Sequence, residues 1–217
     1  MFLTAPPVDE RRARLAAAHL YAITADQEPE RVAAVAGACL RGGADLLQLR
    51  HKTLSRGALL VLAQRLREAT AAAGALFIVN DHLDIALLAD ADGVHLGDDD
   101  LSVAEARRLA APGFLVGASA SNPDAARFAV TAGADYLGTG PAFATPIKAA
   151  KPVIGPAGVA AVQQAVGIPV FGIGGVTPEN VHELVAAGIR RACLIRGLFE
   201  AKDPESAARR VKAVLAS

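Results

Sequence analysis

From His19 onward, short apolar runs rich in β-branched residues alternate with longer amphipathic stretches, and this alternation continues to the end of the chain. Short apolar runs are typical of buried strands, and stretches with apolar residues every three or four positions are typical of helices. The repeating unit is therefore a strand followed by a helix. Strands are expected at 20–24, 45–50, 76–80, 93–96, 114–118, 135–138, 169–172 and 192–195.

Helix-capping residues support the same division of the chain. The starts of the expected helices carry Ser, Asn, Thr or Asp caps, and Pro follows Thr177 and Asp203 at the first helical turn. Glycines at 42–43, 133 and 188 mark turns from a helix into the next strand. Helices are expected at 29–41, 55–73, 102–110, 122–132, 178–187 and 204–215.

Eight strand–helix units in 217 residues favour a closed (β/α)₈ barrel, the TIM barrel, over an open doubly wound sheet. No Pro/Ser-rich linker interrupts the alternation, so a single barrel domain is expected over 19–217. Residues 1–18 form an N-terminal extension, with a surface helix expected from Asp9. In such barrels the chemistry belongs to the loops that follow the strands.

The composition narrows the classes of partner. The formal net charge is zero and no basic cluster occurs, which argues against a nucleic-acid partner. No apolar run approaches the roughly 20 residues that a membrane span needs. Cys39 and Cys193 are isolated and are expected to be free structural thiols in a reducing compartment. Without a secretory signal pattern, a cytoplasmic protein is expected, and a homodimer is left open.

Cationic residues occur in two of the expected loops. The segment 138–151 starts with glycine and contains Lys148 and Lys151, so this loop could close over an anion. Strand alternation places Gln48, Arg50 and Lys52 on one side of the second strand. These three residues form either a solvated strand end with a paired arginine or a cationic rim for phosphate.

Carboxylates follow two neighbouring strands. Asp81 follows the third strand, and the run 98–100 follows the fourth. Oxygen ligands from adjacent strand ends suit Mg²⁺, although Asp81 could also cap the next helix. Strand alternation alone does not decide whether Asp98 or Asp100 would face the metal.

The histidines do not indicate a zinc site. His95 lies inside a strand, where a packing role is favoured, and no histidine shows zinc-ligand spacing.

The loops after the later strands contain small residues that suit phosphate. Gly-rich turns at 172–177 and 196–197 expose backbone N–H groups, as in the phosphate sites of many barrels. Ser119 follows the fifth strand and could donate to an anion, whereas Ser121 or Asn122 could cap the following helix. These turns indicate a phosphorylated ligand without indicating the reaction.

Taken together and in chain order, these motifs resemble the thiamine-phosphate synthase family. The resemblance rests on Gln48-Leu-Arg-His-Lys52, Val79-Asn-Asp-His-Leu-Asp-Ile-Ala86, Asp92-Gly-Val-His-Leu-Gly97 with Asp100, Gly117-Ala-Ser119, Asp135-Tyr-Leu-Gly-Thr-Gly-Pro-Ala-Phe-Ala-Thr-Pro-Ile-Lys148 and Gly172-Ile-Gly-Gly-Val176. It implies a transferase that couples hydroxymethylpyrimidine diphosphate with hydroxyethylthiazole phosphate, giving thiamine phosphate and pyrophosphate.

The resemblance also implies roles for individual residues. Arg50, Lys52, Ser119 and Lys148 would be catalytic, because they would stabilise the departing diphosphate. The pyrimidine diphosphate would contact these four residues together with Gln48 and Asn80, and Mg²⁺ would bind Asp81 and Asp100. The thiazole phosphate would contact Thr145, Gly175, Arg196 and Gly197. The thiazole nitrogen is itself the nucleophile, so no nucleophilic side chain is implied.

Three positions depart from the family pattern. Ser121 stands where the family commonly has His, Ile147 where it has a second Thr, and Arg196 where it has a small Ser. A related thiazole tautomerase is an alternative, but its acid/base His falls at Ser121. A non-catalytic binder of thiazole phosphate is the other alternative. A Schiff-base aldolase is disfavoured because no lysine lies at an expected strand end.

Overall fold

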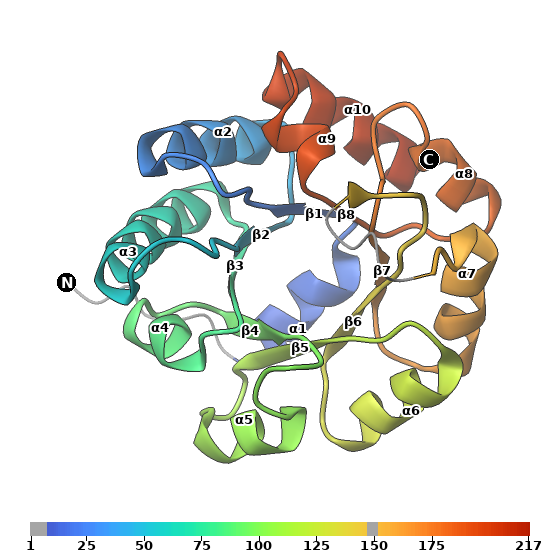
Figure 1. Ribbon diagram of the computed structural model, residues 1–217, viewed down its shortest axis with the longest axis horizontal. Coiled ribbons are helices and arrows are strands. Elements are labelled where there is room, and N and C mark those ends of the chain that lie inside the picture. Colours follow the sequence, from blue (N-terminus) through green and yellow to red (C-terminus); the bar gives the residue numbers. More distant parts are fainter. Residues whose placement is uncertain (1–7, 147–151) are drawn as a thin grey trace.

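Eight parallel strands close into a barrel in a computed structural model that describes residues 8–146 and 152–217 (Figure 1). Each strand pairs with the next along the chain, and β8 pairs with β1 to close the ring. The predicted (β/α)₈ fold is therefore confirmed. The strands are β1 (Leu20–Ile23), β2 (Leu46–Leu49), β3 (Leu76–Asn80), β4 (Gly93–Leu96), β5 (Leu115–Ser119), β6 (Tyr136–Thr139), β7 (Val170–Gly172) and β8 (Ala192–Leu194).

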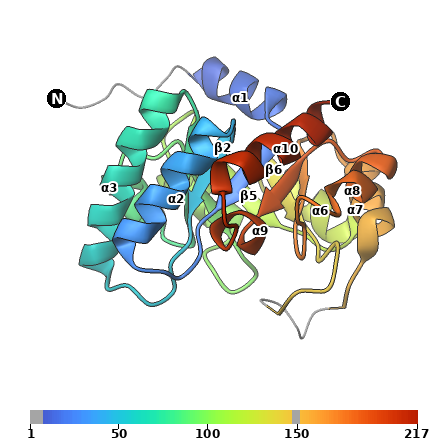
Figure 2. The ribbon, with the colours of Figure 1, turned by 90° about the horizontal axis from the view of Figure 1, so that it is seen from above.

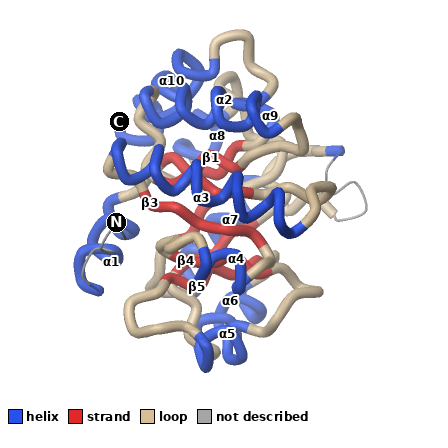
Figure 3. The backbone as a smooth tube through the Cα atoms, turned by 90° about the vertical axis from the view of Figure 1, so that its left-hand side faces the viewer, coloured by secondary structure: helices blue, strands red, loops and turns tan. Residues whose placement is uncertain are grey.

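The strands are buried on both faces, which explains their continuous apolar character. Alternate residues point into the barrel or towards the helices, so the core consists of two clusters. The inner cluster includes Tyr21, Ile78, Tyr136 and Phe171. The outer cluster joins the other strand face to the helices that surround the strands (Figure 3).

Helices follow the strands around the outside of the barrel. The predicted helices are found, although the one expected at 178–187 begins only at Val181. Three further helices, α4, α7 and α9, were not predicted from the sequence. The helices after the N-terminal one are α2 (Pro29–Arg41), α3 (Arg56–Ala73), α4 (Leu83–Leu88), α5 (Val103–Leu109), α6 (Pro123–Thr131), α7 (Gly155–Ala165), α8 (Val181–Ala186), α9 (Arg196–Phe199) and α10 (Pro204–Ala216).

The N-terminal helix α1 (Val8–Ala17) covers the end of the barrel opposite the loop that follows β6 (Figure 2). Leu15 of α1 packs into the inner cluster of the barrel. Arg11 donates from Nε to Asp92 Oδ1 at 3.0 Å, and this carboxylate also accepts from Arg67 Nη1 at 3.2 Å and Phe77 N at 2.9 Å. The helix therefore closes this end with apolar contacts and a buried ion pair.

Two further sequence expectations concern cysteine and membrane-spanning segments. Cys39 and Cys193 are both buried and free, as predicted. Within residues 8–146 and 152–217, no helix has the length and apolar character to cross a membrane.

Candidate active site

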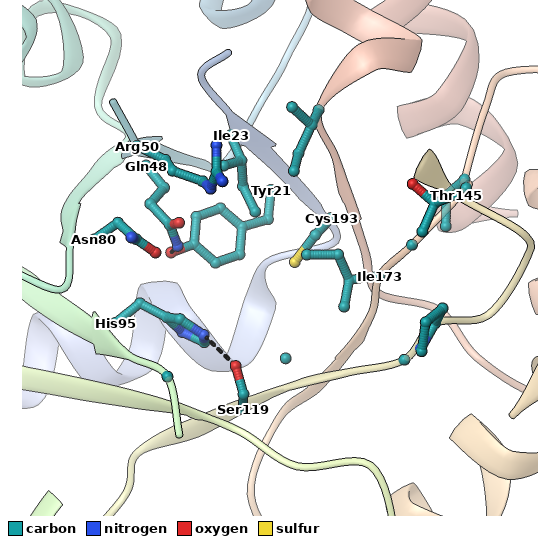
Figure 4. A pocket seen from close by; sticks show the side chains of 18 of the residues that line it. Tyr21, Ile23, Gln48, Arg50, Asn80, His95, Ser119, Thr145, Ile173 and Cys193 are labelled. Atoms are coloured by element: carbon teal, nitrogen blue, oxygen red, sulfur yellow. Dashed lines mark hydrogen bonds between the residues drawn. The ribbon is translucent and has the colours of Figure 1, made fainter. Parts of the chain in front are cut away.

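A pocket of about 810 Å³ opens where the carboxyl ends of the strands meet. Its walls come from β1 and from the carboxyl ends of the other strands and the loops that follow them, as expected for a barrel of this kind (Figure 4). All the predicted site residues that the structure describes line it. They are Gln48, Arg50, Lys52, Asn80, Asp81, Asp100, Ser119, Thr145, Gly175, Arg196 and Gly197. Lys148, the remaining one, lies outside the described residues, as do Ile147 and Lys151.

The cationic wall of the pocket comes from the loop after β2. This strand ends at Leu49, so the prediction that Arg50 belongs to the strand is wrong. Gln48 lies in β2, whereas Arg50 and Lys52 lie in the loop, and all three line the pocket. The Arg50 guanidinium donates to Asp26 Oδ2 at 3.3 Å, and the Lys52 ammonium group pairs with the carboxylate of Asp81.

Residues after β1 hold this loop in place. Thr24 Oγ1 donates to the Arg50 carbonyl at 2.7 Å and accepts from the Arg50 N–H at 2.8 Å. Asp26 Oδ1 accepts from the Lys52 N–H at 2.5 Å. Thr24 and Asp26 were missed at the sequence level. The available signal was that β1 and β2 are neighbours in a barrel, so polar residues following both strands meet at the same edge.

The carboxylate wall comes from the loops after β3 and β4. Asp81 has φ of 63°, the left-handed region that a non-glycine residue seldom adopts, and its N–H donates to the His95 carbonyl at 2.9 Å. The N-cap residue of α4 is His82, so the alternative that Asp81 is this cap is wrong. Asp100 Oδ2 accepts from the Gly97 N–H at 2.7 Å. Asp98 and Asp99 also line the pocket.

The pKa values of the two carboxyl groups move in opposite directions. Burial raises the pKa of Asp81, but hydrogen bonds with Lys52 and Asp100 and the charge of Lys52 outweigh it, so this pKa lies below its usual range. Burial also raises the pKa of Asp100; the Gly97 N–H opposes this rise and Asp81 adds to it, so this pKa lies above its usual range. Asp81 and Asp100 thus shift each other's pKa in opposite directions beside Lys52.

The opposite wall combines the loop after β6 with the glycine turn after β7. Gly174 and Gly175 have φ of 94° and 65°. A Cβ on Gly175 would lie 2.6 Å from the Ala144 carbonyl oxygen, so the close approach of the two segments requires glycine. Asn180 Nδ2 donates to the Gly175 carbonyl at 2.9 Å and steadies the turn.

Arg196 begins α9 at the edge of the pocket. Its Nε lies 2.9 Å from both carboxylate oxygens of Glu200, which also lines the pocket, and both side chains are about half exposed. The sequence did not point to Glu200. This pair places one cation and one anion beside the glycine turn.

Polar side chains, including His95 and Ser119, line the inner end of the pocket. His95 Nε2 lies 3.2 Å from Ser119 Oγ (Figure 4). The His95 ring is tilted against Tyr136, with ring centroids 5.6 Å apart. His95 therefore packs in the barrel, as the sequence favoured, but it also lines the pocket. Tyr21 lines the pocket too and accepts from Gln48 Nε2 at 2.7 Å. The sequence singled out neither Tyr21 nor Tyr136.

Comparison with known proteins agrees with the resemblance. Residues 20–198 match the family model described as thiamine monophosphate synthase. The chain belongs to this family. The thiamine-phosphate synthase of Chlorobium luteolum is 48% identical over 178 residues, covering 81% of this chain and 84% of that protein. The thiamine-phosphate synthase of Gloeobacter violaceus is 45% identical over 193 residues, covering 89% of this chain but only 56% of that longer protein.

A solved structure from the same family has the same fold. The thiamine phosphate pyrophosphorylase of Pyrococcus furiosus superposes with a TM-score of 0.84 and 33% identity, covering 94% of this chain and 97% of that one. The chain thus spans nearly all of this family member and about half of the Gloeobacter relative.

Proposed function

We propose that the protein is a thiamine-phosphate synthase, which couples hydroxymethylpyrimidine diphosphate with hydroxyethylthiazole phosphate and releases pyrophosphate. The observation that carries the proposal is the convergence of a cationic wall, a carboxylate pair and a glycine turn on one pocket. This arrangement suits two small phosphorylated substrates bound side by side. Membership of the thiamine monophosphate synthase family supports the same activity.

The diphosphate would lie against the loop after β2. Arg50 offers a planar guanidinium fork and Lys52 a point charge, and both line the pocket near the carboxylates. As the carbon–oxygen bond breaks, negative charge develops on the departing pyrophosphate, and fixed cations stabilise it. Ser119 can donate a hydrogen bond to the same group. We assign a similar role to Lys148 on the family pattern.

We propose that Asp81 and Asp100 bind Mg²⁺. The donor set fits this ion, because Mg²⁺ is commonly held by one or two carboxylates and completes its shell with water and substrate phosphates. In the described residues no group of three or more His, Cys, Asp or Glu side chains could hold a metal, so an ion held by Asp81 and Asp100 would need water and substrate oxygens to complete its shell. When bound, the ion would neutralise part of the diphosphate charge.

Bond formation needs no side-chain nucleophile. The thiazole nitrogen attacks the pyrimidine methylene carbon, a carbon–nitrogen bond forms, and the carbon–oxygen bond to pyrophosphate breaks with its electron pair leaving on oxygen. The amino group of the pyrimidine ring can delocalise positive charge at that carbon. We assign the thiazole phosphate to Thr145, Gly175, Arg196 and Gly197. The protein then contributes positioning, electrostatics and the exclusion of water.

The decisive experiment is turnover by the purified protein. With both substrates and Mg²⁺, thiamine phosphate and pyrophosphate should form in equal amounts, measured by chromatography and ³¹P NMR. Binding of both ligands without product would instead identify a non-catalytic thiazole-phosphate binder.

We further propose a cytoplasmic location, which cell fractionation tests. The homodimer stays a prediction, and light scattering of the purified protein tests it.

A further inference from the structure

Three side chains form a buried hydrogen-bond chain beneath the pocket. Gln48 Nε2 donates to Tyr21 Oη at 2.7 Å, and Tyr21 Oη lies 2.9 Å from Tyr136 Oη. Gln48 is 2% exposed, and both tyrosines are fully buried. Gln48 and Tyr21 line the pocket, whereas Tyr136 lies behind Tyr21 and does not line it. In Figure 4, the side chains of Gln48, Tyr21 and Asn80 point towards one another.

The two tyrosine rings cannot turn away from this arrangement. Each packs edge-on against Phe171, with ring centroids 5.5 Å away for Tyr21 and 5.9 Å for Tyr136. A Cβ on Gly117 would lie 2.1 Å from Tyr136 Cζ, so the Tyr136 ring occupies space that only glycine leaves open. The Tyr136 hydroxyl is therefore held in one place.

In the structure, the amide nitrogen of Gln48 faces Tyr21 and the carbonyl oxygen is left for a ligand. A phenol hydroxyl carries one proton, and burial raises the pKa of Tyr21 and Tyr136 well above the usual range, so both stay protonated. Tyr21 Oη accepts from the Gln48 amide nitrogen. Either hydroxyl can be the donor between the two tyrosines, and when Tyr21 donates to Tyr136 its proton is not available to the Gln48 carbonyl oxygen. With the nitrogen engaged by Tyr21, the carbonyl oxygen is the amide atom presented to the pocket.

We propose that Tyr136 is a positioning residue that acts through Tyr21 to hold the Gln48 carbonyl oxygen towards the pocket, so that the site selects a heteroaromatic ring with an exocyclic amino group. An amino substituent donates to this carbonyl oxygen. A ring that lacks the substituent leaves the oxygen without that donor, and a buried unsatisfied acceptor is costly. The inference rests on the proposed function for the identity of the aminopyrimidine.

The test compares binding of two probes by calorimetry. These are the aminopyrimidine diphosphate and the analogue in which hydrogen replaces the amino group. Wild-type protein should bind the amino compound more tightly, and Tyr136→Phe should reduce this Kd ratio about fivefold, as expected for about one neutral hydrogen bond. The affinity for inorganic pyrophosphate should not change, because Tyr136 does not line the pocket.

Two further variants separate positioning from general damage to the fold. In a Gln48→Ala background, adding Tyr136→Phe should leave the Kd ratio unchanged, because the amide through which Tyr136 acts is gone. Thr70→Val is the matched control: Thr70 is fully buried, its hydroxyl donates to the Arg67 carbonyl at 2.9 Å, and it does not line the pocket. This variant loses a buried hydroxyl but should keep the wild-type ratio.

The possible results lead to distinct conclusions. An unchanged ratio in Tyr136→Phe, an equal reduction in the Gln48→Ala background, or wild-type protein that binds both probes equally would overturn the positioning role. Turnover with the thiazole phosphate, measured in parallel on wild-type protein, reports separately on the proposed function. A protein that discriminates between the probes through Tyr136 but forms no product would retain this inference and lose the synthase assignment.

Discussion

The buried ion pair beneath the barrel provides the sharpest stability prediction. Asp92 is fully buried and accepts hydrogen bonds from the guanidinium groups of Arg11 and Arg67, whose side chains are only 9% and 8% exposed. Asp92→Asn keeps the size of the side chain but removes the negative charge between two buried cations. Breaking a buried pair in this way costs about 3–5 kcal/mol, because the remaining charges stay out of water without a counter-ion.

The expected consequence is a large loss of stability. For a chain of this length, each kcal/mol shifts Tm by about 2–4 °C, so Tm should fall by roughly 10 °C. Urea unfolding followed by circular dichroism measures this loss. If the dependence of the free energy of unfolding on urea concentration keeps the same slope, the shift in the midpoint urea concentration gives the change in that free energy. Arg11→Leu should cost less than Asp92→Asn, because Asp92 keeps the Arg67 and Phe77 hydrogen bonds.

A surface ion pair provides the matched control. Asp84 pairs with Arg56 on the outside of the barrel, where the two side chains are 58% and 54% exposed. Asp84→Asn should therefore change the free energy of unfolding by less than about 1 kcal/mol. If Asp92→Asn were as mild as Asp84→Asn, the reasoning about an uncompensated buried charge would be wrong.

The remaining predictions concern the active site. Asp81→Ala should lose Mg²⁺-dependent turnover while its circular dichroism spectrum stays native; unchanged activity would reject the metal assignment. Lys148→Ala should lower kcat far more than Lys202→Ala, an exposed lysine outside the pocket, and equal effects would refute a specific role for the loop. Arg196→Ser should raise the KM for thiazole phosphate by about tenfold, as loss of a charge-assisted hydrogen bond predicts. An unchanged KM would assign Arg196 to its pair with Glu200 alone.

Much of the fold follows from local pattern. The alternation of apolar runs and amphipathic stretches placed all eight strands to within two residues, because a strand buried on both faces leaves a continuous apolar run. Helices α4, α7 and α9 were missed because their sequences show no clear amphipathic pattern. Helices α4 and α9 are six and four residues long, and α7 contains no charged residue to mark an exposed face.

Most residues of the candidate site could also be predicted from the sequence. In a closed barrel every loop that follows a strand reaches the same end, so a count of strands suffices to collect the residues around one pocket. The exact residues at which strands end were harder to predict. Arg50 lies beyond β2 because its backbone N–H and carbonyl are hydrogen-bonded to the Thr24 hydroxyl. Thr24 follows β1, so this contact forms only when β1 and β2 are neighbours in the barrel.

Pairings between distant segments were decided by the tertiary structure alone. Tyr21 and Tyr136 are 115 residues apart, and Arg11 and Asp92 are 81 apart, yet each pair meets by a hydrogen bond once the barrel closes. Periodicity reports only whether a side chain faces inward or outward, not which partner it meets there. By itself, therefore, the sequence determined the barrel and the set of loops that form the pocket. The closed structure decided how Gln48 is oriented and how α1 is attached.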